Sequence, residues 1–269
     1  MRLACLFSGG KDSVYALHLA KYAGHEISCL VAMRPQNTES FLFHVPNIDW
    51  TKLQAESMGF PLLIVQTSGQ KSQEMKDLKR VLSELKQKNK IEGVVTGAVF
   101  STYQASRIQK ICFELGLFCY NPLWQTSPAS HWHELLVNGF EVILTSVAAQ
   151  GLDNEWLGKK MDENAVHVLR SLEKKHGLSS IGEGGEFESF VVNAPLFAKK
   201  IYISNYHDEW KGLQGTRHIL RAQLVDEHLR KKINPSQKAS VKKIRVKPKK
   251  LVKKKRVKAK RAKHGRNSR

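Results

Sequence analysis

Hydrophobic and polar positions follow a regular rhythm over the first 120 residues. Apolar runs of strand length, at 2–7, 26–33, 61–66, 91–98 and 117–120, are separated by segments with helical spacing, at 13–22, 49–58, 72–90 and 101–115. Gly24 and Gly59 lie one or two residues beyond the ends of two of these segments, at a position where glycine commonly ends a helix. Strands that alternate with helices predict a parallel sheet covered by helices on both faces. Residues 1–120 are therefore predicted to form an α/β domain.

The rhythm changes after Asn121 and Pro122. Helices are predicted at 130–138 and 163–176, strands at 141–148, 190–192 and 200–206, and a loop rich in glycine and glutamate at 181–189. Helices and strands no longer alternate one for one. Residues 121–229 are therefore predicted to form a smaller α+β domain.

Charge separates a third segment from these two. Of the 44 Lys and Arg residues, 20 lie in 230–269, which has no Asp or Glu; this leaves 24 basic residues against 24 acidic ones in 1–229. Such a composition predicts a disordered basic tail. The tail is a candidate for electrostatic binding to RNA or the ribosome, with a nuclear-localisation run and a solvated tail without a fixed partner as alternatives.

Composition also limits the location of the protein. The four cysteines form no CxxC pair, so a zinc ribbon or a redox pair is not indicated. No apolar run approaches the roughly 20 residues of a membrane helix, and Arg2 leads into a short strand rather than a signal peptide. We therefore expect a cytoplasmic protein without membrane contacts.

The strongest chemical signal is the sequence SGGKDS at Ser8–Ser13, between the first predicted strand and helix. Gly9 and Gly10 permit a tight turn and a close approach of backbone N–H groups to phosphate oxygens. The following helix directs its N-terminus to the same point. The hydroxyl groups of Ser8 and Ser13 and the ammonium of Lys11 add donors, whereas Asp12 requires Mg²⁺ between itself and phosphate. The turn is thus predicted to bind the phosphates of a nucleotide.

SGGKDS resembles the PP-loop of the N-type ATP pyrophosphatases. The resemblance implies that the turn holds the β- and γ-phosphates of ATP, which leave together as pyrophosphate. It also implies that an adenylate forms on a substrate oxygen and is then displaced by a nucleophile. Lys11 and Asp12 become candidate catalytic residues, and Asp12 the candidate Mg²⁺ ligand.

Three further stretches narrow the resemblance: 39–47 (ESFLFHVPN), 96–124 (TGAVFSTYQASRIQKICFELGL to NPLW) and 182–189 (GEGGEFES). In this order they resemble the diphthine–ammonia ligase family, over about residues 1 to 225. Phe187 and Ser189 stand where the family more usually has Tyr and Thr. The resemblance implies a ligase that forms a C–N bond, with ammonium and the diphthine of translation elongation factor 2 as substrates.

Several other residues are predicted to line the site. Thr96 and Gly97 end a predicted strand, where the glycine would let an adenine or ribose approach the backbone. Tyr103 and Arg107 share one helix face, and Arg107 could contact a phosphate or the substrate carboxylate. Outside the glycine-rich loop, the residues predicted to bind the substrate are His44, Tyr103, Gln104 and Arg107.

The glycine-rich loop supplies the carboxylates that a cationic substrate requires. Its candidate substrate-binding residues are Glu183, Gly184, Gly185, Glu186 and Glu188. Ammonium must lose a proton before its nitrogen attacks, and a glutamate with a raised pKa can accept it. We assign that base role to Glu186, with Glu183 as the alternative.

Two other functions remain open from the sequence alone. A tRNA-modifying PP-loop enzyme, either a thiolase or a lysidine-type ligase, agrees with the basic tail, although the missing CxxC pair speaks against the thiolase. A non-catalytic nucleotide sensor would bind ATP without forming AMP.

Overall fold

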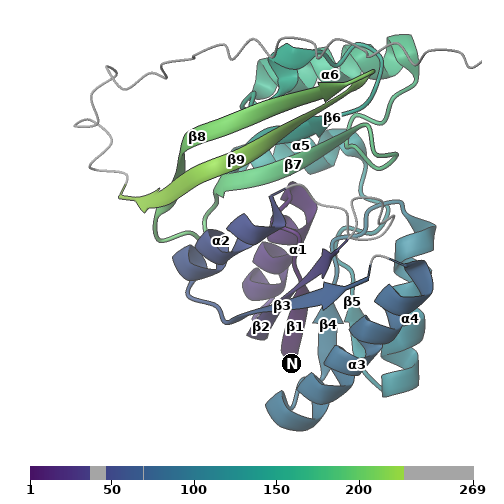
Figure 1. Cartoon of the computed structure of the whole chain (residues 1–269). Coiled ribbons are helices and arrows are strands. Elements are labelled where there is room, and N and C mark those ends of the chain that lie inside the picture. The colour runs from purple at the N-terminus through teal and green to yellow at the C-terminus, as the bar shows by residue number, and fades with distance from the viewer. Residues whose placement is uncertain (37–46, 69, 227–269) are drawn as a thin grey trace, which may run out of the picture. The chain divides into compact units, whose positions relative to one another are not determined.

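The computed structural model describes residues 1–36, 47–68 and 70–226. Five described strands form a parallel sheet in the order β3-β2-β1-β4-β5 (Figure 1). Their bounds are β1 (Arg2–Leu6), β2 (Glu26–Pro35), β3 (Leu62–Thr67), β4 (Gly93–Val95) and β5 (Phe118–Tyr120). The chain extends the sheet first to one side of β1 and then to the other. Ligands bind at such a switch point, here beyond the carboxyl ends of β1 and β4.

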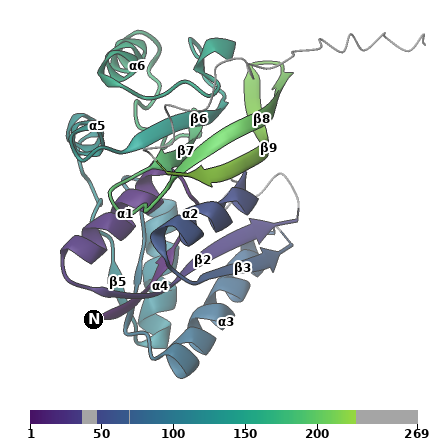
Figure 2. The ribbon, with the colours of Figure 1, turned by 90° about the vertical axis from the view of Figure 1, so that its left-hand side faces the viewer.

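Helices cover both faces of this sheet (Figure 2). Leu3 and Cys5 of β1 lie in one buried cluster with α1, whereas Ala4 lies in another with α3 and α4. This alternation is the period of two that a strand buried on both faces requires. The helices are α1 (Lys11–Tyr22), α2 (Thr51–Met58) with the short η1 (Ile48–Trp50), α3 (Lys71–Asn89) and α4 (Thr102–Leu115). The predicted α/β class is confirmed.

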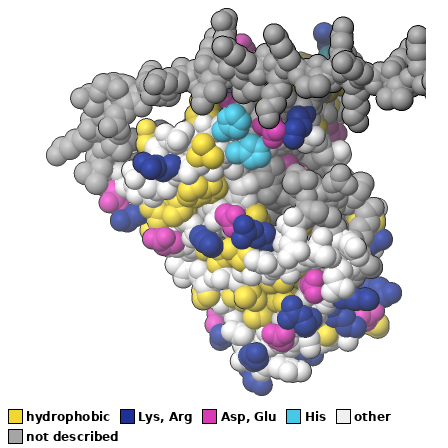
Figure 3. Space-filling model, viewed as in Figure 1, with side chains coloured by type: hydrophobic (Ala, Val, Ile, Leu, Met, Phe, Trp, Pro, Cys, Tyr) yellow, Lys and Arg dark blue, Asp and Glu magenta, His cyan; other side chains and the backbone are white. Residues whose placement is uncertain are grey.

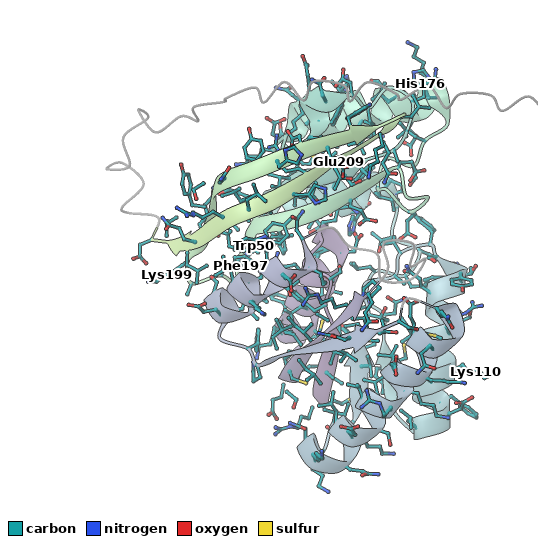
Figure 4. The ribbon with its side chains drawn as sticks, viewed as in Figure 1. Trp50, Lys110, His176, Phe197, Lys199 and Glu209 are labelled. Atoms are coloured by element: carbon teal, nitrogen blue, oxygen red, sulfur yellow. The ribbon has the colours of Figure 1, made fainter. Side chains whose placement is uncertain are left out.

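The second region contains an antiparallel sheet in the order β7-β6-β9-β8. Its elements are α5 (Pro128–Val137), β6 (Glu141–Val147), η2 (Asn154–Trp156), α6 (Glu163–His176), β7 (Phe187–Asn193), β8 (Lys200–Lys211) and β9 (Gln214–Val225). Val142 and Leu144 pack in the cluster that contains α5 and α6, and Ile143 faces the other way, toward Trp50. Figure 4 shows Trp50 and Phe197 between α2 and this sheet. The two sheets therefore enclose α1 and α2 between them.

The second sheet differs from its prediction in three respects. β7 begins at Phe187, so Glu188 and Ser189 lie in a strand rather than in the glycine-rich loop. β8 continues to Lys211, and β9 is not among the predicted strands. Many residues of this hairpin are exposed on both faces, which removes the alternation on which strand prediction depends. Gly212, with φ of 59°, begins the two-residue turn between Lys211 and Gln214 and was the available signal.

Two predicted features lie outside the described residues. They are His44, in 37–46, and the basic tail at 230–269. Over the described surface in Figure 3, basic and acidic side chains are interspersed. No helix among the described residues is long and apolar enough to cross a membrane.

Candidate active site

The turn at Ser8–Ser13 lies beyond the carboxyl end of β1 and is packed against two other elements. Gly9 has φ of 79°, and a Cβ there would lie 2.3 Å from Gln54 Oε1. A Cβ on Gly10 would lie 3.2 Å from the carbonyl oxygen of Ser189. The buried Gln54 donates from Nε2 to the carbonyls of Gly9 at 2.9 Å and Val191 at 2.8 Å. The glycines therefore permit close contact with α2 and β7 as well as an exposed backbone.

The turn keeps backbone donors for an anion. Among the described residues, no acceptor takes the N–H groups of Gly9, Asp12 and Ser13. The hydroxyl groups of Ser8 and Ser13 lie 3.1 Å apart beside them. Unpaired N–H groups at a helix N-terminus carry partial positive charge and bind phosphate or carboxylate. The local geometry thus fits the predicted phosphate turn.

Lys11 lies beneath the turn rather than at its surface. Its side chain is 4% exposed, and Nζ donates to the carbonyl of Ile181 at 2.6 Å and to Asp12 Oδ2 at 2.9 Å. Its backbone N–H donates to Ser189 Oγ at 3.1 Å. Lys11 therefore ties the turn to the second region and neutralises Asp12, and its own side chain does not line the cavity described below.

Asp12 is held from both sides. Lys11 contacts Oδ2, and Nε2 of the fully buried His131 lies 2.7 Å from Oδ1. Burial alone would raise the pKa of Asp12, but Lys11 and His131 outweigh it and lower the pKa to about 2. The carboxylate is therefore ionised at every physiological pH.

The three carboxylates of the 182–188 segment have different environments. Glu183 Oε1 accepts from the N–H of Val99 at 3.1 Å. Glu186 accepts from the N–H groups of Ser179 at 2.8 Å and Gly184 at 2.7 Å, and it does not line the cavity. Burial raises the pKa of Glu188 to about 7, with Lys11 opposing and the charge of Asp12 adding to the rise. The geometry thus disfavours Glu186 as the base, because its oxygens stabilise its own loop.

A cavity of about 420 Å³ opens at the carboxyl edge of the parallel sheet, between the turn and the glycine-rich loop. One part of its lining is apolar: Leu6, Phe7, Val31, Met33, Ile48, Met75 and Ile108. The other part is polar and includes Ser8, Asp12, Ser13, Thr96, Gln104, Ser146, Glu183, Glu188 and Gln214. An apolar pocket that ends in convergent polar groups is the usual form of a small-molecule site.

The structure brings some of the predicted residues together and leaves others outside. Gly97 and Gly185 line the cavity, and a Cβ on Gly97 would lie 2.8 Å from the backbone of Asp12. This glycine is therefore required for contact with α1. The guanidinium of Arg107 stacks at 3.4 Å on the Tyr103 ring and donates to the Tyr103 carbonyl at 3.1 Å, and neither side chain lines the cavity.

Sequence reasoning missed Gln54, His131 and Ser189 as residues that contact the turn. Gln54 lies on a helix face and His131 is one of two histidines in SHWHE, so neither belongs to a recognisable motif, whereas Ser189 is the last residue of GEGGEFES. The hydrogen bond from the Lys11 N–H to Ser189 Oγ joins residues that are 178 positions apart in the chain, which no local pattern predicts.

The described residues offer few ligands for a metal ion. Within the described residues, no group of three or more His, Cys, Asp or Glu side chains is arranged to hold a metal ion. Both Asp12 oxygens already contact a side chain, although each retains a lone pair. An ion here would take most of its ligands from a substrate or water, as Mg²⁺ usually does.

This fold and cavity define an α/β protein with a candidate ligand site at the switch point of a parallel sheet. Family comparison specifies it further. Residues 1–119 match the diphthamide synthase N-terminal domain, and residues 128–225 match the diphthamide synthase C-terminal domain. The chain belongs to the diphthamide synthase family.

Curated relatives agree with this assignment. A diphthine–ammonia ligase of Bos taurus is 32% identical over 87% of this chain and 95% of the relative. One of Danio rerio is 34% identical over 76% of this chain and 86% of the relative. One of Schizosaccharomyces pombe is 34% identical, but this chain spans only 36% of its length. The predictions of an ATP-using ligase that forms a C–N bond and takes part in diphthamide biosynthesis are confirmed.

Proposed function

We propose that this chain amidates the diphthine of translation elongation factor 2, using ATP and ammonium. The observation that carries the proposal is the position of the Ser8–Ser13 turn at the polar end of a partly apolar cavity. The unpaired N–H groups there suit the β- and γ-phosphates. The apolar lining around Val31 and Met33 suits the adenine ring. Family membership supports the same substrates.

The proposed reaction has two bond exchanges. An oxygen of the diphthine carboxylate attacks the α-phosphorus of ATP, and the bond to the β-phosphate oxygen breaks, releasing pyrophosphate. Ammonia then attacks the acyl carbon of the adenylate, and the bond to the AMP oxygen breaks, leaving the amide. Donors around the β- and γ-phosphates stabilise the charge that develops on pyrophosphate. Mg²⁺, with Asp12 as its protein ligand, would share this role.

The nitrogen nucleophile must shed protons before and after its attack. We assign proton acceptance to Glu188 in place of Glu186, because Glu188 lines the cavity and Glu186 does not. A carboxylate with a pKa of about 7 is poised to accept a proton near neutral pH. Glu183, which also lines the cavity, is proposed to contact the cationic part of diphthine.

AMP formation tests this function. The purified protein is incubated with ATP, Mg²⁺ and ammonium, together with either diphthine-bearing elongation factor or bulk tRNA. We expect AMP and amidated factor only with the factor and ammonium both present. AMP that depends on tRNA instead would overturn the proposal, and ATP binding without AMP in any mixture would identify a nucleotide sensor.

Two further predictions from the sequence are proposed beside this function. The protein is proposed to act in the cytoplasm, where its proposed substrate would take part in translation. The basic segment 230–269 is proposed to bind RNA or the ribosome. Retention on RNA that does not fall as salt rises would contradict an electrostatic attachment.

A further inference from the structure

His131 joins the two regions of the protein at the phosphate turn. It belongs to α5, in the region matched by the C-terminal family domain, whereas Asp12 lies in the first turn of α1 in the N-terminal one. The histidine is fully buried, and its Nε2 lies 2.7 Å from Asp12 Oδ1. A polar side chain buried this deeply requires a specific partner, and this carboxylate is that partner.

The surroundings fix the direction of this hydrogen bond. Asp12 is ion-paired with Lys11 Nζ at 2.9 Å and is therefore a carboxylate that only accepts, so Nε2 of His131, at 2.7 Å, carries the hydrogen and donates. Nδ1 is buried and has no hydrogen-bond partner among the described residues, so it is suited to carry a lone pair. Tyr15 meets the ring edge-on, with 5.6 Å between ring centroids. Trp132, the next residue, donates to the carbonyl of Ser180 at 2.7 Å and anchors α5.

The consequence falls on Asp12. Lys11 takes Oδ2 and His131 takes Oδ1, so the carboxylate cannot rotate without losing a charge-assisted hydrogen bond. The part of Asp12 that remains accessible lines the cavity. We propose that His131 is a positioning residue that holds Asp12 in the orientation required for nucleotide binding at the turn. This inference rests on the proposed binding of ATP there.

Two amide substitutions separate the hydrogen bond from the volume of the ring. In His131→Gln the amide nitrogen falls near the original Nε2 and can still donate to Asp12. In His131→Asn the shorter amide ends near Nδ1 and cannot reach. The probe is ATP with Mg²⁺, measured by calorimetry, with AMP formation as a second readout. His133→Asn, an exposed histidine on the same helix, is the matched control.

We expect His131→Asn to weaken ATP binding roughly 10-fold or more, since a hydrogen bond to a charged group is lost. His131→Gln should stay within about 3-fold of the original affinity, and His133→Asn should be unchanged. The loss should appear in the KM for ATP more than in kcat. Equal ATP affinity of folded His131→Asn and the original protein would overturn the inference. An equal loss in both amide variants would do the same.

A measurement without ATP keeps the inference testable on its own. Nitrogen NMR of the histidine rings should show Nε2 of His131 protonated and Nδ1 bare. A hydrogen on Nδ1 instead would mean that Nε2 does not donate to Asp12, and the inference would fall. If the unmutated protein shows this tautomer but binds no ATP, the proposed binding of ATP at the turn is wrong. The proposed role of His131 in nucleotide binding is then wrong as well.

Discussion

The parallel and antiparallel regions contribute differently to the same site. The parallel region carries the recognisable turn, but several of the turn's polar groups are satisfied from the antiparallel region. Ile181, Ser189 and His131 contact Lys11 or Asp12, and the N–H of Val191 donates to the carbonyl of Gly9 at 3.1 Å. The SGGKDS motif lies in the parallel region, but its conformation therefore depends on contacts with the antiparallel region.

Removing the Lys11 charge should break this dependence most severely. In Lys11→Met the carbonyl of Ile181 and the carboxylate of Asp12 lose their shared donor inside the protein. Removing one partner of a buried ion pair costs about 3 to 5 kcal/mol. We expect the free energy of unfolding in urea to fall by about 3 kcal/mol and AMP formation to be lost.

Lys21→Met, on the exposed end of the same helix, is the control and should change stability by less than about 0.5 kcal/mol. If Lys11→Met were as stable as this control, Lys11 would not link the two regions.

Glu188, in the antiparallel region, should make the stability of the protein depend on pH. Its pKa is raised from 4.5 to about 7 by burial, so between these values the folded protein binds a proton that the unfolded chain releases. This contribution to stability is complete below pH 4.5 and is lost as pH rises through 7. At 1.36 kcal/mol for each pH unit, the loss is at most about 3 kcal/mol.

Urea unfolding at pH 5 and pH 7.5, for the original protein and Glu188→Gln, measures this contribution. The glutamine variant should lose less stability over the interval, because other groups titrate equally in both proteins. If the free energy of unfolding changes by the same amount between pH 5 and pH 7.5 in both proteins, the Glu188 carboxyl is not buried as the structure has it.

Gly9 and Gly10 form a natural pair for testing the packing of the turn. An alanine at Gly9 meets Gln54 at 2.3 Å and must keep φ near 79°, whereas Gly10 has φ of −77° and its Cβ would lie 3.2 Å from Ser189. We expect Gly9→Ala to cost about 2 kcal/mol and Gly10→Ala about 1 kcal/mol or less. Thermal unfolding compares them, and a larger cost at Gly10 would contradict the packing described for Gly9.

The sequence predicted the first region better than the second for a physical reason. Each parallel strand is a continuous apolar run between helices, so residues such as Val31 and Val94 identify it locally. β9 offers no comparable run, and its pairing with β6 and β8 is decided by contacts distant in the chain. The same distinction separates Asp12, found within a motif, from His131, whose contact spans 119 residues.

Glu186 and Glu188 show how this distinction affects the chemistry. Both belong to one motif, yet the Glu186 oxygens accept backbone hydrogen bonds from Ser179 and Gly184, whereas Glu188 lines the cavity. In Glu186→Gln the new NH₂ group would face a backbone N–H, which costs about 1 kcal/mol through one lost hydrogen bond. AMP formation by the folded variant should stay within about 3-fold of the original, whereas Glu188→Gln should lose most of it. A carboxylate that only stabilises its loop can be replaced without stopping the reaction. If Glu186→Gln folds stably but forms no AMP, while Glu188→Gln remains active, the base role would belong to Glu186.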